Sequence, residues 1–291
     1  MPRSFRQIID QAVQDKRFLV VPGAHDALSA RIIQKLGFET YFIGGFPAVG
    51  ARYGVPDVGL KGFGEIAACV RDIMAACDLP VFVDGDDGYG DVKNVVHTVQ
   101  SYERMGVSAI LIEDQQWPKR CGHMVGKKVV PVEIAEAKIR AACGERINPE
   151  TWILARTDAR AVYDLDEAMR RAERYIKAGA DGIFIEAPRS VKELEIIGKT
   201  FGNTVPQICN PLMGGHTPIL SMDELGQLGF HCAVLGLDTV MHAAKAIETV
   251  LIDMKSGAFK RRNDGMDFED YKKVVGYDKW EGVDDRYAPR T

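Results

Sequence analysis

Carboxylate side chains stand at the ends of two short apolar runs of the sequence. Asp84 and Asp86 end the run PVFVDGD (80–86), and Glu113 lies near the end of AILIED (109–114). Residues two apart in a strand point to the same side, so Asp84 and Asp86 are expected to face one site. Neighbouring carboxylates repel each other unless a cation lies between them. Oxygen ligands without His or Cys suit Mg²⁺ or Mn²⁺, which predicts a metal site, with helix capping or pairing to Lys and Arg as the alternative.

A cysteine in a basic segment is the second candidate for chemistry. Cys121 stands in KRCGH (119–123), inside a connection that spans roughly residues 115–130. A thiol flanked by Lys, Arg and His is expected to have a lowered pKa and to act as a proton donor or nucleophile, although an incidental loop cysteine is the alternative. Long connections in compact barrels are often lids. The other five cysteines fall inside apolar patterns and are interpreted as small core residues: Cys69, Cys77, Cys143, Cys209 and Cys232.

An arginine near the end of a third apolar run offers a positive counterpart. Arg156 stands in WILART (152–157), and a guanidinium at the end of a buried strand needs an anion. It is expected either to clamp a substrate carboxylate or to form an internal ion pair with Glu113 or Glu186. Gly44-Gly45 and Asn210 follow two further runs.

Short apolar runs alternate with amphipathic helical patterns along most of the chain, which predicts βαβ units and a parallel sheet. Eight such units fit a closed (β/α)₈ barrel, in which the active site lies at the carboxyl ends of the strands. An open doubly wound sheet is the alternative, but PGAHDALS (22–29) after the first run is not a Gly-rich nucleotide loop. The eight runs are 18–22, 40–44, 80–86, 109–114, 152–157, 182–187, 205–209 and 232–236.

Composition and charge limit the class of protein. The 291 residues include 37 Lys plus Arg and 41 Asp plus Glu, and this net charge of −4 argues against a nucleic-acid binder. With 46% hydrophobic and 27% charged residues, the chain is not expected to be disordered. No apolar run approaches the roughly 20 residues of a membrane span, and the N-terminus lacks a secretory pattern. We therefore expect a cytoplasmic protein with reduced thiols.

The chain is expected to divide into a barrel domain, residues 1–256, and a helical extension, residues 257–291. The extension is polar but keeps large apolar groups such as Phe268, Tyr271 and Trp280. These side chains predict docking on another surface, such as that of a neighbouring subunit, with a disordered C-terminus as the alternative.

Several motifs together resemble the isocitrate lyase and phosphoenolpyruvate mutase superfamily. They are PGAHDALSA (22–30), GVPD (54–57), DGDDGYGDVKNV (84–95), IEDQQWPKRCGHMVGKKVVP (112–131) and LARTDAR (154–160). The KRCGH loop is similar to the carbon–carbon lyase branch, which contains methylisocitrate, dimethylmalate and petal-death lyases. The resemblance implies an α/β barrel whose last helix is exchanged between the subunits of a homotetramer.

The resemblance also implies roles for individual residues. Mg²⁺ would lie near Asp84 and Asp86, with Asp57 and Glu113 contributing mainly through waters. Cys121 would protonate the carbanion left by bond cleavage, and Tyr41 or a metal-bound water is a candidate to remove the hydroxyl proton. The expected substrate contacts are Tyr41, Gly44, Gly45, Gly122, His123, Arg156 and Asn210.

The implied activity is cleavage of a 2-hydroxy- or 2-keto-dicarboxylate to a pyruvate- or glyoxylate-type acid and a second carboxylate. Oxaloacetate decarboxylation or hydrolysis, phosphonate mutase chemistry and a non-catalytic barrel that binds small acids are the alternatives. Ile43 and Met213 depart from the family pattern, in which Ser or Thr and Glu are usual, and are expected to make the pocket bulkier and less polar.

Overall fold

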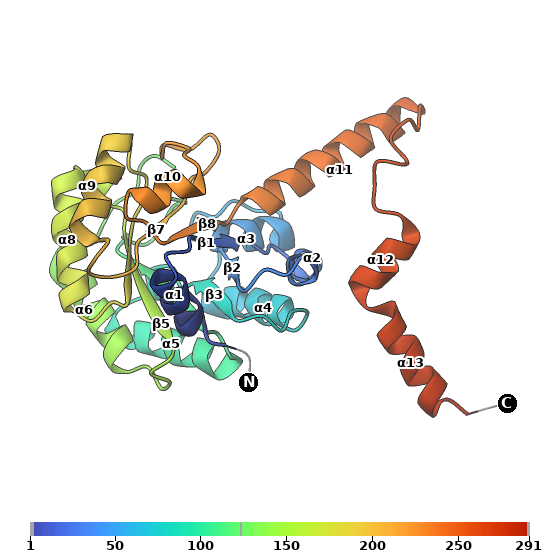
Figure 1. Ribbon diagram of the computed structural model, residues 1–291, viewed down its shortest axis with the longest axis horizontal. Helices are drawn as coiled ribbons and strands as arrows, with labels where there is room; N and C mark the ends of the chain where they lie inside the picture. The colour runs from blue at the N-terminus through green and yellow to red at the C-terminus, as the bar shows by residue number, and fades with distance from the viewer. Residues whose placement is uncertain (1–2, 123, 290–291) are drawn as a thin grey trace.

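In the part of the chain that the structure describes, eight short parallel strands form the centre (Figure 1). The computed structural model describes residues 3–122 and 124–289. Two hydrogen-bonded sheets have the orders β1-β8-β7 and β2-β3-β4-β5-β6. The strands are β1 (Leu19–Pro22), β2 (Tyr41–Ile43), β3 (Val81–Asp84), β4 (Ala109–Glu113), β5 (Trp152–Thr157), β6 (Gly182–Ile185), β7 (Ile208–Cys209) and β8 (Cys232–Leu235).

Single parallel bridges join the two sheets at both seams. Gly23 bridges to Phe42 between β1 and β2, and Ile183 bridges to Gln207 beside β7. The strands therefore follow one another around a ring in chain order, with continuous ladders inside each sheet. The α/β barrel class predicted from the alternating pattern is confirmed.

Helices surround the ring, and local sequence explains where they begin and end. The Asp91 side chain accepts a hydrogen bond at the start of α5, and Gly106 ends that helix with φ 91°. The outer helices are α2 (Ala27–Lys35), α4 (Phe63–Met74), α5 (Val92–Met105), α6 (Val132–Gly144), α8 (Leu165–Lys177), α9 (Val191–Phe201) and α10 (Met222–Gln227).

Alternation along each strand separates the core into two layers. Val83 and Ile110 point outward and pack against the helices. The inward-pointing residues form the barrel interior together with α1 (Phe5–Gln14). Phe5 from α1 lies 5.2 Å, between ring centroids, from both Phe82 and Trp152. Helix α1 therefore plugs the end of the barrel opposite the predicted active site.

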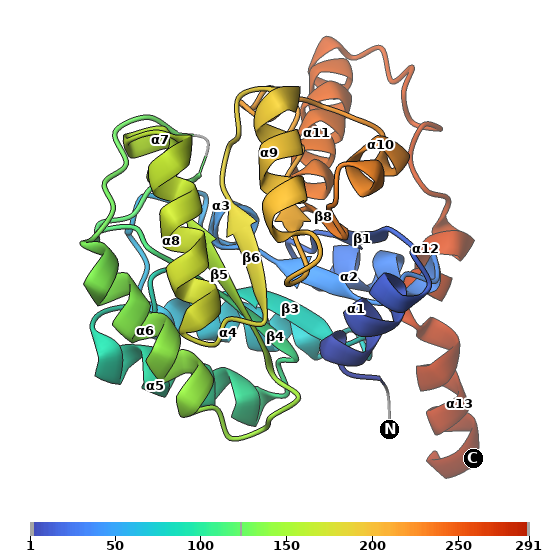
Figure 2. The same cartoon turned by 60° about the vertical axis from the view of Figure 1, so that its left-hand side comes forward.

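The C-terminal part of the chain extends beyond the ring of strands. Helix α11 (Asp238–Ser256), which lies within the predicted barrel domain of residues 1–256, projects away from the barrel and has no buried residue (Figure 1). The division at residue 257 stays a prediction. Helix α12 (Phe268–Val275) lies against α2 of the same chain (Figure 2), and α13 (Tyr277–Tyr287) follows. Packing on a neighbouring subunit stays a prediction. No described helix is long and apolar enough to cross a membrane.

Candidate active site

The turn after β2 brings the chain close to the acidic residues. Gly44 precedes helix α3 (Gly45–Tyr53), and the Gly45 N–H donates to Asp84 Oδ2 at 3.4 Å. A Cβ on Gly45 would lie 3.2 Å from the Lys119 Nζ atom and 3.5 Å from the Asp57 Oδ2 atom. This glycine therefore allows the helix N-terminus to approach the charged groups closely.

The predicted metal-site residues do come together, but an ammonium group lies among them. Lys119 Nζ lies 2.6 Å from Asp57 Oδ2 and 2.6 Å from Asp86 Oδ1. Burial raises the pKa of Asp86 to about 7 even though Lys119 acts against this change. Within residues 3–122 and 124–289, no three His, Cys, Asp or Glu side chains are arranged to hold a metal by themselves.

The geometry of the two neighbouring aspartates differs from the prediction. Strand β3 ends at Asp84, and Asp86 has φ 48°, so the extended alternation does not reach it. The Asp86 N–H donates to Asp84 Oδ1 at 3.0 Å. Asp84, Asp57 and Glu113 line the pocket, whereas Asp86 lies behind them. A left-handed turn, and not strand alternation, is what brings the pair together.

Arg156 lies among three buried carboxylates. Its Nε is 3.0 Å from Asp158 Oδ2, and one Nη is 3.5 Å from Glu113 Oε2 and 3.4 Å from Glu186 Oε2. The internal ion pairs weighed from the sequence are thus present, and Asp158 is an additional partner that the sequence reasoning missed. These carboxylates raise the pKa of Arg156 despite its burial. The guanidinium still lines the pocket, so contact with a ligand is open to it.

The connection between β4 and α6 folds over the pocket as a closed loop. Gln115 and Val129 form an antiparallel bridge at its base, and Lys127 donates to Asp158 Oδ1 at 2.7 Å and to the Gly122 carbonyl oxygen. A Cβ on Gly122 would lie 2.4 Å from an Arg156 Nη atom. Any larger residue would have to displace the ends of the Arg156 and Glu186 side chains, so glycine favours this close approach of the loop.

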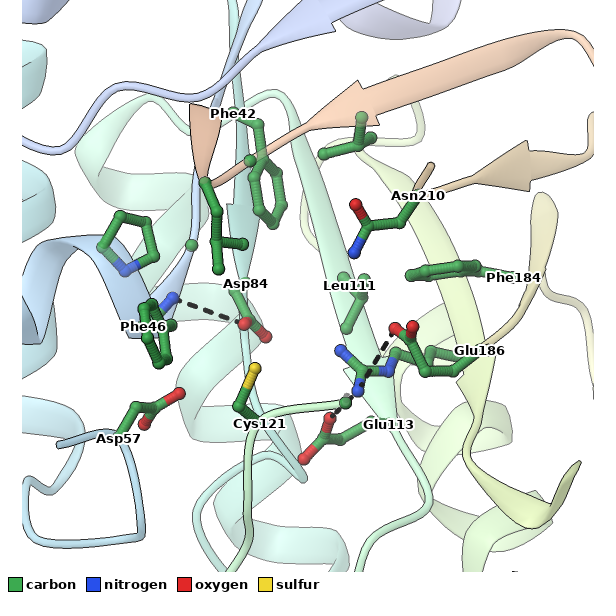
Figure 3. A pocket seen from close by; sticks show the side chains of 18 of the residues that line it. Phe42, Phe46, Asp57, Asp84, Leu111, Glu113, Cys121, Phe184, Glu186 and Asn210 are labelled. Atoms are coloured by element: carbon green, nitrogen blue, oxygen red, sulfur yellow. Dashed lines mark hydrogen bonds and ion pairs between the residues drawn. The ribbon is translucent and has the colours of Figure 1, made fainter. Parts of the chain in front are cut away.

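Cys121 lies between the acidic residues on the two sides of the pocket. In Figure 3 its sulfur points toward Asp84, with Asp57 on one side and Glu113 on the other. The thiol faces the cavity as the lid interpretation requires. None of the six cysteines forms a disulfide. His123, which was expected to contact substrate, lies outside the described residues.

The remaining wall of the pocket is mostly apolar. The cavity has a volume of about 50 Å³, comparable with a few water molecules, so the closed loop leaves room only for a small ligand. Asn210 and Glu186 add polar groups opposite Asp84 (Figure 3). The apolar lining includes Phe42, Phe46, Pro47, Leu111, Leu154, Phe184 and Val234.

Three expectations about side chains near the pocket are wrong. Tyr41 is fully buried in the outer layer beside Cys77, and burial raises its pKa, so its hydroxyl is not in the pocket. Ile43 shares that layer, because residues 41 and 43 point to the same side of β2. Met213 is 68% exposed and does not line the cavity. Neither departure from the family pattern therefore makes the cavity bulkier.

The lysines of the loop are the main residues whose contacts were missed. Lys119 and Lys127 are both buried and paired with Asp57, Asp86 and Asp158. The available signal was the excess of basic residues in a loop that crosses an acidic rim, since buried charges need partners.

The fold and this pocket define an α/β-barrel protein with an acidic, cysteine-bearing site at the carboxyl ends of its strands. Residues 10–255 match the phosphoenolpyruvate phosphomutase family, and the chain belongs to that family, as its motifs predicted.

Relatives and solved structures agree with this assignment. The chain is 37% identical over 280 residues to 2,3-dimethylmalate lyase of Eubacterium barkeri, with 96% of each chain covered. It is 36% identical to 2-methylisocitrate lyase of Halalkalibacterium halodurans, covering 99% of this chain and 96% of that one. An oxaloacetate acetylhydrolase complex with 3,3-difluorooxalacetate superposes with TM-score 0.92 at 28% identity, covering 100% and 99%. For 2,3-dimethylmalate lyase, a member of the PEP mutase/isocitrate lyase superfamily, the TM-score is 0.89 at 28% identity, covering 98% and 95%.

Proposed function

We propose that this protein is a Mg²⁺-dependent carbon–carbon lyase. Its substrate is a 2-hydroxy- or 2-keto-dicarboxylate of the methylisocitrate or dimethylmalate type, cleaved to a pyruvate- or glyoxylate-type acid and a second carboxylate. The observation that carries the proposal is the Cys121 thiol, held by a closed loop over a small cavity that Asp84 and Arg156 also line. The relatives named lyases on such acids support it.

The acidic residues fit a hard divalent cation. Their donors are all oxygens, and Glu113 Oε1 is buried without a hydrogen-bond partner within the described residues. Mg²⁺ keeps several waters and uses few protein ligands, so Asp84, which lines the cavity, would hold it, with Asp57 and Glu113 acting through waters. The role expected for Asp86 would require its carboxylate to leave Lys119. When bound, the cation would supply positive charge that makes it easier for the hydroxyl of the 2-hydroxy-acid half to lose its proton. Mn²⁺ suits the same ligands.

Arg156 and the start of α3 are placed to bind the acidic half of the substrate. The guanidinium lines the cavity, and the helix presents Gly45 and Phe46 at its positive end. Gly44 and Asn210 line the same cavity. A carboxylate between these groups would be held in a fixed orientation, which brings the bond to be cleaved under the loop.

Cys121 is proposed to donate its proton to the carbanion that cleavage leaves. The thiol faces the cavity, and Gly122 brings the loop down onto Arg156, which excludes water from the reacting atoms. Because Tyr41 faces the helices, the hydroxyl proton would be taken by a water held at the acidic residues, which was the other candidate.

Hydrolysis of the carbon–carbon bond of oxaloacetate is the second candidate. The TM-score of 0.92 to an oxaloacetate acetylhydrolase complex favours it. The two reactions differ in their products, since hydrolysis would yield oxalate and acetate, whereas lyase activity would yield a 2-oxo acid.

The test is an assay of both product types from a panel of dicarboxylates with Mg²⁺, using the parent protein, Cys121→Ser and the matched control Cys143→Ser. Cys143 is half-buried in α6, away from the cavity. We expect 2-oxo acid release by the parent and the control, and kcat at least about 100-fold lower for Cys121→Ser. Oxalate, a mimic of the 2-oxo acid product, should still raise the Tm of Cys121→Ser, which would show that binding is kept. Full activity of Cys121→Ser would refute the acid role, and oxalate formation from oxaloacetate would favour the second candidate.

The subunit arrangement and location are part of this proposal. Ile247, Leu251 and Ile252 on α11 are each more than half exposed, which supports exchange of this helix between subunits of a homotetramer. Light scattering of the purified protein tests it, and a monomer at micromolar concentration would contradict it. Cytoplasmic location stays a prediction.

A further inference from the structure

We propose that Gln115 is a positioning residue that latches the Cys121 loop to the barrel. Its side-chain amide lies almost completely buried, with 1% exposure, beneath a segment that has no regular secondary structure. The role of the loop in catalysis rests on the proposed function, whereas the latch itself is a property of the loop.

The amide group of Gln115 makes both bonds that the backbone of residue 120 offers. Oε1 accepts from the Arg120 N–H at 2.9 Å, and Nε2 donates to the Arg120 carbonyl oxygen at 2.8 Å. An amide paired in this way imitates a neighbouring strand. It fixes the backbone immediately before Cys121, so the direction of the thiol depends on it.

The same amide reaches the acidic site. Gln115 Nε2 also donates to Glu113 Oε2 at 3.2 Å. One side chain thus connects the backbone before the thiol to a carboxylate that lines the cavity. Closing the loop and orienting Glu113 are therefore coupled through a single group.

The contacts of Lys119 that hold the loop are ionic, and they depend on the charge of the pocket. Lys119 pairs with Asp57 and Asp86, two carboxylates of the proposed cation site. A bound cation would compete with that ammonium group, whereas the neutral amide of Gln115 carries no such charge. Unlike the Lys119 ion pairs, the two Gln115 bonds to the Arg120 backbone are therefore suited to hold the loop when the charge of the site changes.

The experiment compares Gln115→Met with the matched control Gln116→Met, because Gln116 is exposed on the same segment. Methionine keeps length and burial but removes the donor and the acceptor. The first readout is the rate at which iodoacetamide alkylates Cys121, followed by peptide mass spectrometry. The second is the separate measurement of kcat and KM.

For Gln115→Met we expect Cys121 alkylation at least about tenfold faster and kcat at least about tenfold lower, with KM within threefold. The control is expected to stay within twofold of the parent in each measurement. A thiol that is alkylated at the parental rate in Gln115→Met would overturn the latch. Since alkylation needs no turnover, a protein that cleaves no dicarboxylate but still shows this rate difference would refute the proposed function and retain the latch.

A measurement on the unsubstituted protein covers the case in which Gln115→Met does not fold. The latch predicts slow hydrogen exchange of the Arg120 amide, although its residue lies in an exposed loop segment. Exchange at the rate of an unstructured peptide would overturn the proposal.

Discussion

The two ends of the barrel bury different kinds of side chains, charged at one end and aromatic at the other. At the carboxyl ends of the strands, charged side chains such as Asp86, Lys119 and Arg156 are at least nine-tenths buried. At the other end, Phe5 packs on Phe82 and Trp152 without charged groups in the contact. Burying apolar area stabilises folding, whereas removing charges from water opposes it even when they are paired. The amino ends of the strands therefore supply stability, and the carboxyl ends use part of it to hold reactive groups.

Removing the Phe5 aromatic ring from the barrel end that α1 closes gives the largest expected loss of stability. Phe5→Ala should lower the free energy of unfolding by about 4 kcal/mol, because it opens a cavity beneath the barrel. kcat at 20 °C should not change, since Phe5 does not line the active-site cavity. Urea unfolding and steady-state kinetics measure both. Val13→Ala on the same helix is the control, because Val13 is 37% exposed. A matching loss of kcat would show that activity at one end depends on packing at the other, against the separation described above.

Breaking a buried ion pair at the carboxyl ends of the strands should lower the free energy of unfolding somewhat less than Phe5→Ala does. Lys138 Nζ lies 2.9 Å from Asp87 Oδ2, and both groups are buried. Lys138→Met leaves that carboxylate buried and unpaired, so we expect a loss of about 3 kcal/mol in urea unfolding.

Adding Asp87→Asn to Lys138→Met should recover part of the loss, because the unpaired charge is then gone. Lys199→Met is the control, since the Lys199 side chain is 80% exposed. If the double variant were less stable than the single one, charge burial would not be the cause.

Divalent cations are expected to bind at the carboxyl ends of the strands and thereby to stabilise the folded protein. At 100 times its Kd, Mg²⁺ should raise the free energy of unfolding by about 2.7 kcal/mol, and excess chelator should abolish the rise. Asp84→Asn should remove the effect, because this carboxylate lines the cavity. Phe5→Ala should keep it. Thermal unfolding with and without Mg²⁺ measures the shift, and an identical shift in Asp84→Asn would locate the cation elsewhere.

The smallest expected effect is a pH dependence at the amino ends of the strands. Burial lowers the pKa of His231, whose Nδ1 accepts the Gln207 N–H at 3.0 Å. The unfolded chain therefore binds the proton more readily, and stability is lost as pH falls below the ordinary value of about 6.5.

His231→Gln should reduce the difference in Tm between pH 7.5 and 5.5, while His242→Gln, on exposed α11, should not. An unchanged difference in His231→Gln would assign this pH dependence to other groups.

Local patterns predicted the elements and most of the site. Asp84, Glu113, Arg156 and Cys121 were located at strand ends or in the loop after β4, and all four line the cavity. They could be found because a polar group after an apolar strand has few other reasons to be there. The wrong assignment of Tyr41 has a simple cause. Strand β2 has only three residues, and alternation alone does not say which of its sides faces the interior.

The partners of the charged groups could not be predicted in the same way. Asp57 and Lys119 are far apart in the sequence, yet their side chains lie 2.6 Å apart. Such pairing depends on how far the loop descends, which Gly122 and the buried Gln115 amide decide together.

The amino-acid sequence by itself determined the alternation of strands and helices, the family and the kinds of group at the barrel mouth, because these follow from periodicity and local motifs. Only the tertiary structure decided which carboxylate faces the cavity, which cation each one pairs with and how α11 projects from the barrel. The physical reason is that burial and short-range electrostatics act between segments distant in the chain, and their strength depends on distances that no local pattern fixes.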